Sequence, residues 1–365
     1  MLVVAKIGTS SVTTPEDGVD AAAVGKLCGE VASEWRVGNK VVVVTSGAVS
    51  TGVAAMGLRG GRPSDARTLQ ALSSVGQHRL MRAYDDSLRA YGLLSGQVLL
   101  APLDFSIRSQ YLHARETLTR LLELGVVPIV NENDAVADDE IRYGDNDRLA
   151  ALVANLVRAD VLVLLTDIEG LFDADPRLVP GASLIEEVAA TDEALGVAAG
   201  GPGSEGGSGG MASKLAAARM AAWSGIRTVI ASAARPGVLA GAIAGTSGVG
   251  TLVAAKERRL SARRLWIAFA LRPAGRIVVD AGARLALVER EASLLAAGVT
   301  GVHGSFAADD AVEIAGPDGA VIAKGLARVP ASRSTEWVGR RSGELASDLP
   351  VEVVHRDDLV VLATR

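Results

Sequence analysis

Short, uninterrupted runs of aliphatic residues recur through the first 255 residues and most constrain the fold. Residues 41–44 (VVVV), 126–130 (VVPIV) and 161–165 (VLVLL) are continuous rather than alternating. Such runs are typical of strands in a parallel sheet that is covered on both faces. Between the opening run and residues 41–44, apolar residues recur at helical spacing after Asp20, a candidate N-cap. Alternating strands and helices predict an α/β fold, a three-layer αβα sandwich.

The pattern changes near residues 256–265, and 365 residues are enough for two domains. A charged connector occupies this region, with Arg263 and Arg264 near its end. Beyond it, strand-like pieces at 275–280 and 312–315 are separated by glycine turns such as 316–319 (GPDG). We therefore expect a first domain over residues 1–255, a linker over 256–265, and a smaller, mostly β, barrel-like domain over 266–365.

Composition excludes several classes of protein. The net charge of −5 argues against a general nucleic-acid binder. A single cysteine, Cys28, excludes a disulfide within the chain and a cysteine-rich zinc site, and it fits a cytoplasmic location. The N-terminus lacks the pattern of a signal peptide. The apolar runs fall well short of the roughly 18 residues that suggest a membrane span.

Five polar clusters follow the predicted strands or precede predicted helices. They are residues 6–10 (KIGTS), 45–48 (TSGA), 131–134 (NEND) with 144–147 (GDND), 166–167 (TD), and the glycine-rich 200–210 running into Lys214. Ligands of open α/β sheets bind outside the carboxyl ends of the strands. We therefore expect all five clusters along one edge of the same sheet.

Each cluster also has a reading that involves no ligand. Lys6 alone suits a surface charge, residues 45–48 suit a tight turn as well as an anion site at a helix N-terminus, and residues 200–210 suit a disordered loop. The Asn and Asp residues of 131–134 suit turns as well as a ligand with an ammonium group. No P-loop and no protein-kinase motif is present. Four scattered histidines support neither a metal cluster nor a Ser-His-Asp hydrolase.

These clusters, in this order, resemble the glutamate 5-kinase family of the amino-acid kinase superfamily. The residues that carry the resemblance are 6–10, 44–48, 129–136 (IVNENDAV), 144–147, 165–167, 170–177 and 209–214 (GGMASK). The NEND and GDND pair is specific to that family, and the remainder is shared with aspartokinases, acetylglutamate kinases and uridylate kinases. The C-terminal part resembles a PUA module at 273–275, 279–283, 298–299 and 354–360. Ala212 is a small departure, because some members have Ser or Val there.

The resemblance implies ATP-dependent phosphorylation of the side-chain carboxylate of L-glutamate to L-glutamyl 5-phosphate, the first step of proline biosynthesis. Catalytic roles would fall to Lys6, Lys214 and Asp147, with Asp147 orienting the two lysines. Ser46, Asp134 and Asn146 would bind glutamate. ATP, with Mg²⁺ on its oxygens and no protein metal ligand assigned, would be bound by Lys6, Thr166, Asp167, Ser208, Gly209, Gly210, Met211, Ala212, Ser213 and Lys214.

The resemblance also implies proline as a feedback inhibitor and a homo-oligomer, a dimer or a tetramer. RNA binding by the PUA module stays open, although the acidic chain argues against it. Two alternatives remain at this stage. One is another amino-acid kinase on the same fold, and the other is a regulatory protein that binds RNA through the PUA module.

Overall fold

Two units make up the chain, Met1–Arg259 and Leu260–Arg365, and each is described by itself. The computed structural model describes all residues except 17, 59–62, 137–145, 175, 177, 180, 190–209, 257–259, 341–351 and 363–365. The division lies within the region where the sequence predicts a linker, 256–265. The part of that region from Ala262 to Leu265 forms helix α10, which belongs to the second unit.

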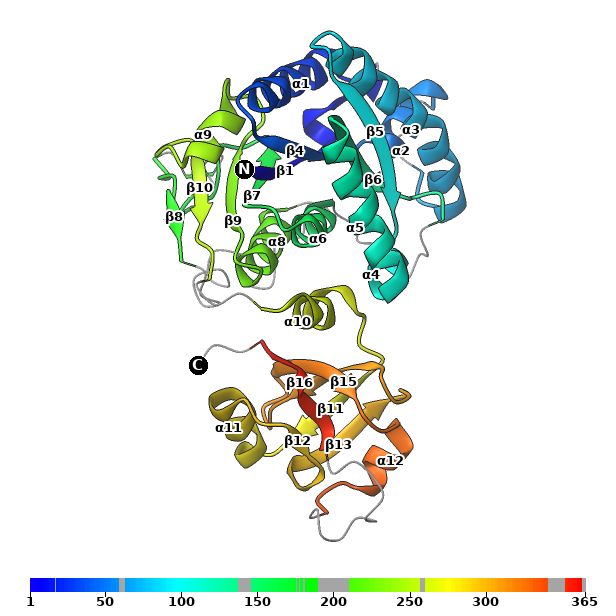
Figure 1. Ribbon diagram of the computed structural model, residues 1–365, viewed down its shortest axis with the longest axis vertical. Helices are drawn as coiled ribbons and strands as arrows, with labels where there is room; N and C mark the ends of the chain where they lie inside the picture. Colours follow the sequence, from blue (N-terminus) through cyan, green and yellow to red (C-terminus); the bar gives the residue numbers. More distant parts are fainter. Residues whose placement is uncertain are drawn as a thin grey trace. The chain divides into compact units, whose positions relative to one another are not determined.

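An eight-stranded sheet organises the first unit (Figure 1). Its order is β5 (Leu94–Leu100), β6 (Val126–Glu132), β4 (Lys40–Val44), β1 (Leu2–Ile7), β7 (Val161–Thr166), β9 (Arg227–Ser232), β10 (Gly250–Val253) and β8 (Glu187–Val188). The six strands from β5 to β9 are parallel, and β10 runs antiparallel to β9. The three predicted aliphatic strands are confirmed as β4, β6 and β7, and the sheet is mixed at one edge.

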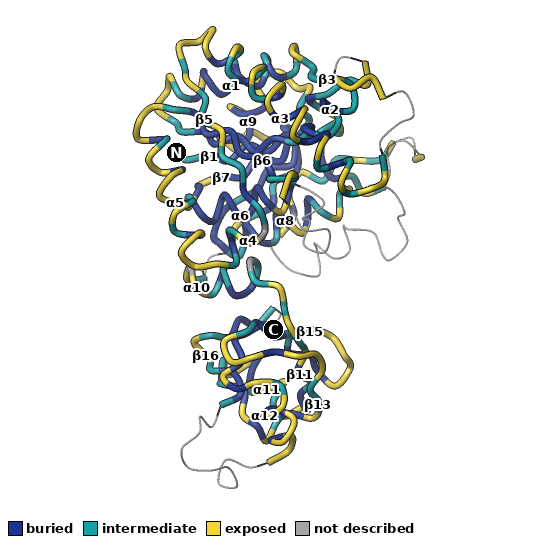
Figure 2. Tube along the Cα trace, turned by 90° about the vertical axis from the view of Figure 1, so that its right-hand side faces the viewer, coloured by how far each residue is buried: buried dark blue, intermediate teal, exposed yellow. Residues whose placement is uncertain are grey.

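Helices cover both faces of this sheet, which confirms the three-layer αβα architecture (Figure 1). One layer contains α1 (Ala21–Arg36), α3 (Ala66–Arg89) and α9 (Val238–Ala244), whose buried residues share a core with Val3, Ala5 and Ile7. The other layer contains α5 (Arg108–Glu123), α6 (Asn146–Val157) and α8 (Met211–Trp223). Because side chains alternate along a strand, Lys6 points toward the second layer. Figure 2 shows the inner strands, such as β1, β4 and β7, among the most deeply buried parts of this unit, whereas the edge strand β5 is largely exposed or half-buried.

Helix α1 begins where its sequence predicts. Asp20 is the N-cap, and its Oδ1 accepts hydrogen bonds from the backbone N–H groups of Ala22 and Ala23 at 3.0 and 2.9 Å. Gly38 follows the helix with φ of 91°, a left-handed conformation that glycine adopts without strain. Cys28 faces the core, where burial raises its pKa to about 12, so the thiol stays protonated at neutral pH.

Two glycines allow α2 (Ala48–Ala55) and α3 to pack backbone against backbone. A Cβ atom on Gly76 would lie 1.8 Å from the carbonyl oxygen of Ala48, and one on Gly52 would lie 2.0 Å from that of Leu72. Because glycine is a poor helix former, the sequence predicts a helix over 64–91 with Gly76 as a possible interruption, but the structure has no interruption there. The helix runs unbroken through Gly76, because the glycine serves close packing rather than a bend.

The second unit contains a six-stranded, mostly antiparallel sheet, which confirms the predicted mostly β domain. Its order is β12 (Leu294–Leu295), β16 (Glu352–Val361), β15 (Val321–Ala327), β14 (Ala311–Ala315), β11 (Gly275–Val279) and β13 (Val299–Gly304). Only β11 and β14 pair in parallel among the described strands of this sheet. The predicted turn at 316–319 connects β14 to β15, with the Gly319 N–H donating to Gly316 O at 3.0 Å. Helices α11 (Ala281–Arg290) and α12 (Ala331–Glu336) and a 3₁₀ turn, η3 (Ala296–Gly298), complete the described elements of the unit beyond residue 274.

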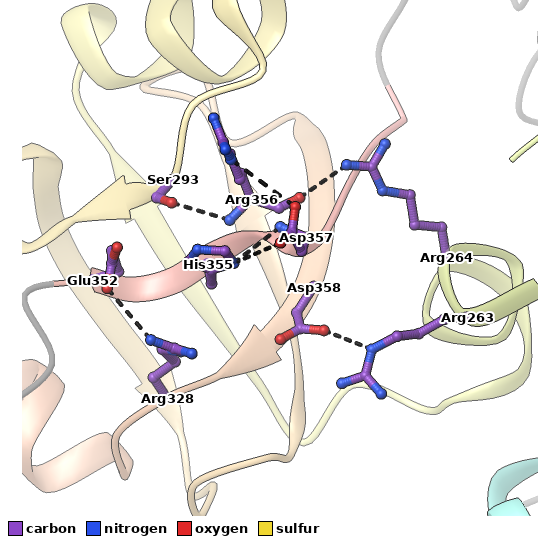
Figure 3. Close-up of polar contacts among 9 residues, drawn as sticks. All are labelled: Arg263, Arg264, Ser293, Arg328, Glu352, His355, Arg356, Asp357 and Asp358. Atoms are coloured by element: carbon purple, nitrogen blue, oxygen red, sulfur yellow. Dashed lines mark hydrogen bonds and ion pairs between the residues drawn. The ribbon is translucent and has the colours of Figure 1, made fainter. Parts of the chain in front are cut away.

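Cations attach the segment from α10 to residue 271 to the sheet of the second unit (Figure 3). Arg263 Nε lies 2.7 Å from Asp358 Oδ1, and Arg264 Nη2 donates to Arg356 O at 3.1 Å. The buried Lys324 donates from Nζ to Ala268 O at 3.3 Å and also to Leu271 O. These contacts explain why Arg263 and Arg264 belong to the second unit.

Among the described helices of the whole chain, none is long and apolar enough to cross a membrane.

We expect Gly76→Ala to destabilise the protein by about 1–3 kcal/mol or more, because the new methyl group overlaps the backbone of α2. Gly25→Ala in α1 is the matched control, since a Cβ there meets no atom within 4 Å. It should stabilise by about 0.5–1 kcal/mol through helix propensity. Urea unfolding of the two variants and the wild type measures both effects. Equal stability of the two variants would contradict the close-packing argument.

Candidate active site

A carboxylate buried between two lysines lies at the centre of the candidate site. Asp147 is fully buried, its Oδ1 lies 2.5 Å from Lys6 Nζ, and its Oδ2 lies 3.1 Å from Lys214 Nζ. The lysines are themselves only 3% and 6% exposed. Among these three side chains, two positive charges meet one negative charge. Buried cations at the end of a strand suit a polyanion such as a phosphate chain.

Three separate elements supply these charges. Lys6 lies near the carboxyl end of β1, Asp147 in the first turn of α6, and Lys214 in the first turn of α8. A carboxylate at the start of a helix interacts favourably with the helix dipole. Gly210 is the N-cap of α8, and Lys214 is the fourth residue of the helix. The ion pairs therefore join the end of β1 to the first turns of α6 and α8.

The register of the sheet brings four polar clusters to one edge. Lys6 pairs with Val44 on β4 and with Leu164 on β7, and Val44 pairs with Val130 on β6. Thr45, Asn131 and the end of β7 at Thr166 therefore lie at neighbouring strand ends. The fifth cluster joins them through the ion pair between Lys214 and Asp147. For the described residues of these clusters, the structure thus has the arrangement along one sheet edge that the sequence predicts; residues 144–145 and 200–209 lie outside the described residues.

A chain of side-chain amides lies beside the charged cluster. Asn146, the neighbour of Asp147, donates from Nδ2 to Thr45 O at 2.5 Å and to Asn131 Oδ1 at 2.7 Å. Asn131 in turn donates from Nδ2 to Gln77 Oε1 at 2.7 Å. Asn146, Asn131 and Gln77 are all more than nine-tenths buried. The N-terminus of α6 therefore connects two polar systems, one charged and one neutral.

The Thr45 side chain links this junction to the opposite helical layer. Its Oγ1 lies 2.8 Å from the hydroxyl of Tyr84, which is fully buried on α3. Burial raises the pKa of Tyr84 above its ordinary value, so the phenol stays protonated and available for this hydrogen bond. Ser46 follows, half-buried, and Gly47 has φ of 105° at the N-cap of α2. Only a glycine adopts this conformation without strain, so the tight turn predicted at 45–48 is present.

Asp134 and the nucleotide candidates lie at two further strand ends. Asp134 is half-buried in the turn after β6, and its Oδ2 accepts a hydrogen bond from Ser73 Oγ at 3.2 Å. Thr166 is buried at the end of β7, and its Oγ1 donates to Oδ1 of the exposed Asp167 at 3.0 Å. From Gly210 to Ser213 the chain is exposed or half-buried, and Lys214 is buried. Ser208 and Gly209 lie outside the described residues.

Two polar residues of α3, Ser73 and Gln77, were missed as site candidates by sequence reasoning. Both are buried, on the helix face that contacts Asp134 and Asn131. They are four residues apart and so lie on one face of the helix. The available signal was a pair of polar residues on the face that also carries Leu69, Leu72 and Leu80. On a helix that packs against a core, such a pair has a polar partner to satisfy.

Known proteins match both units. The amino acid kinase family matches residues 1–232, and the PUA domain matches residues 275–346. A protein named glutamate 5-kinase from Mycobacterium tuberculosis (strain ATCC 25177 / H37Ra) is 47% identical over 362 residues, which cover 99% of this chain and 95% of that protein. One of the same name from Mycobacterium avium (strain 104) is 45% identical over 359 residues, 98% and 96% of the two chains. The chain therefore belongs to the amino acid kinase family, and within it to the glutamate 5-kinase family.

We expect Asp147→Asn to destabilise the protein by about 3 kcal/mol or more, because it removes a buried negative charge that pairs with two buried lysines. The side chain keeps its size, so the loss measures charge rather than packing. Asp86→Asn on α3 is the control, because Asp86 is exposed and its ion pair with an exposed arginine, at 3.6 Å, contributes little to stability. Urea unfolding of the wild type and the two variants measures the loss of stability in each. A loss below about 1 kcal/mol for Asp147→Asn would show that the lysines do not depend on it for burial.

Proposed function

We propose that this chain transfers the terminal phosphoryl group of ATP to the side-chain carboxylate of L-glutamate. The products are L-glutamyl 5-phosphate and ADP, as in the first step of proline biosynthesis. The observation that carries the proposal is the buried Lys6–Asp147–Lys214 cluster beside Asn146, in a chain of the glutamate 5-kinase family. The cluster provides positive charge, and its neighbour Asn146 provides a polar contact for a small amino acid.

The nucleophile requires no general base. The glutamate side chain has a pKa of about 4.3 and is ionised at neutral pH. The protein must instead bring two anions together and offset the charge that develops on the transferring phosphoryl group. Lys6 and Lys214 supply two cations for this purpose from opposite sides of Asp147. Asp147 acts as a positioning residue, because both its oxygens already face lysine ammonium groups.

Glutamate would bind at the ends of β4 and β6. Asp134 offers a carboxylate to the substrate ammonium group, and Ser73 holds that carboxylate through a hydrogen bond. Ser46 lies directly after Thr45, whose carbonyl group holds Asn146. Ser46, Asp134 and Asn146 are therefore proposed as the glutamate-binding residues. They come from three different elements that the sheet register brings together.

ATP would bind across β7 and the N-terminus of α8. Thr166 and Asp167 form one side of the proposed nucleotide site, and Gly210, Met211, Ala212, Ser213 and Lys214 form the other, together with Ser208 and Gly209. The exposed start of α8 offers backbone N–H groups to phosphate oxygens. We propose Mg²⁺ as the ion that accompanies ATP and neutralises phosphate charge, held mainly by the nucleotide and water. The pairing of Asp147 with two lysines fits a metal carried by the nucleotide rather than by that carboxylate.

Partners and location are also proposals. All residues named for catalysis and binding lie in the first unit, so we propose that this unit holds the whole active site. Proline shares the α-carboxylate and a cationic nitrogen with glutamate but has no second carboxylate, so we propose that it competes for the glutamate site. A homo-oligomer and a cytoplasmic location complete the proposal, the latter from the single, buried cysteine.

An assay of ADP release tests the function directly. The purified chain is incubated with Mg-ATP and with glutamate, aspartate, N-acetylglutamate or uridine monophosphate, and glutamate is repeated with millimolar proline. We expect turnover with glutamate alone among these acceptors and a lower rate with proline at low glutamate. Turnover with another acceptor and none with glutamate would indicate a different kinase on the same fold.

We expect Lys214→Met to lower kcat by about 100-fold or more while KM for glutamate changes little. The lysine acts where charge develops on the phosphoryl group, so its loss raises the barrier rather than weakening substrate binding. Lys26→Met is the control, because it removes a cation from α1 in the other helical layer. Steady-state kinetics with both substrates measures the effect. A kcat within a few-fold of wild type would remove Lys214 from the catalytic set.

We expect Asp134→Asn to raise KM for glutamate by about 10-fold or more and to leave KM for ATP nearly unchanged. The substitution retains an oxygen that accepts from Ser73 but removes the charge that would pair with the substrate ammonium group. Initial rates over a matrix of glutamate and ATP concentrations separate the two constants. An equal rise in both would place Asp134 outside the glutamate site.

A further inference from the structure

The buried amide of Gln77 has no role in the reaction as described so far. Gln77 lies on α3, is 8% exposed, and accepts a hydrogen bond at Oε1 from Asn131 Nδ2 at 2.7 Å. Its neighbour Gly76 lies in the close contact with α2. That contact brings this turn of α3 near the backbone that leads into the site. The position of Gln77 is therefore set by helix packing.

Backbone groups determine which way each amide in the chain from Gln77 to Asn146 is turned. The carbonyl group of Thr45 can only accept, so it must face the Asn146 nitrogen. The N–H of Glu132 can only donate, and it donates to Asn131 Oδ1 at 2.9 Å. Asn131 must then present its nitrogen to Gln77, which presents its oxygen in return. The two backbone groups therefore determine the orientation of all three side-chain amides.

This orientation decides what Asn146 offers to a ligand. Both N–H donors of Asn146 are used, one by Thr45 O and one by Asn131 Oδ1. The side-chain atom that remains for a ligand is the oxygen, which is an acceptor. Asp134 is also an acceptor. The two residues therefore suit the same end of glutamate, its ammonium group.

The buried amide of Gln77 is energetically unfavourable in one respect, so packing alone does not explain why a glutamine lies here. Its Nε2 is buried and has no hydrogen-bond partner among the described residues. A buried donor without a partner destabilises the folded state, whereas an apolar side chain of the same length would avoid that cost. What Gln77 contributes and an apolar residue lacks is the oxygen that holds Asn131.

We propose that Gln77 is a positioning residue for glutamate, which acts through Asn131 to hold Asn146 with its oxygen toward the substrate ammonium group. The proposal rests on the proposed function and adds a determinant of its substrate specificity. Without the acceptor on Gln77, the Asn131 amide is held only at its oxygen, by Glu132 N–H and Asn146 Nδ2, and turns more freely. Asn146, still bonded to Thr45 O, is then held less firmly in its orientation, and glutamate binds less tightly.

The test is a double-mutant cycle on KM for glutamate with Gln77→Met, Asn146→Ala and the double variant. Met has a similar size and no acceptor of comparable strength. We expect Gln77→Met to raise KM for glutamate about 10-fold, with KM for ATP and the melting temperature nearly unchanged. The double variant should be no worse than Asn146→Ala by more than about 2-fold, because Gln77 acts through Asn146. Gln110→Met on α5 is the control, since Gln110 is exposed on a helix, and its kinetics should match wild type.

Several results would overturn the proposal. An unchanged KM for glutamate in Gln77→Met would show that the amide chain is not needed. Effects of the two variants that multiply would mean that Gln77 acts independently of Asn146, by touching the substrate or by supporting the fold. A large drop in melting temperature with equal rises in both KM values would indicate a structural role. Absence of glutamate-dependent ADP release by the wild type would instead defeat the proposed function, and this proposal with it.

Discussion

The buried carboxylate of Asp147 is the interaction on which the arrangement of the first unit depends. An isolated charge in a protein interior is costly, and Asp147 and the two lysines reduce that cost for one another by pairing. This pairing holds the end of β1 against the first turns of α6 and α8. The same charges face the sheet edge where the other polar clusters end. Structure and proposed catalysis therefore depend on one set of contacts.

A second, neutral system extends this arrangement to the opposite helical layer. Gly52 and Gly76 let α2 and α3 approach at backbone distance, and α3 then brings Ser73 and Gln77 to the ends of β6. Hydrogen bonds from backbone groups of known polarity determine the direction of each amide. The proposed site thus combines acceptors on Asp134 and Asn146 with cations on Lys6 and Lys214. A substrate with an ammonium group and a carboxylate to be phosphorylated has complementary polarity.

Much of the fold is predictable from the sequence because its signals are local. Continuous aliphatic runs mark the buried parallel strands, Asp20 marks the start of α1, and the turn at 316–319 marks a hairpin. Two features were not predictable in this way. Gly76 reads as a break in a helix, although the structure uses it for close packing. Arg263 and Arg264 read as part of a linker, although they bind β16 of the second unit.

The sequence by itself determined the residue types of the site and their places at strand ends and helix starts, because parallel strands deliver such residues to one edge. The family motifs added an expected role for each of them. Only the tertiary structure decided that Asp147 holds Lys6 and Lys214 at the same time, over separations of 141 and 67 residues. It also decided that Gln77 and Ser73, which no motif marks, reach the site. These contacts depend on how helices pack across the sheet, and helix packing is a property of the whole fold rather than of any segment.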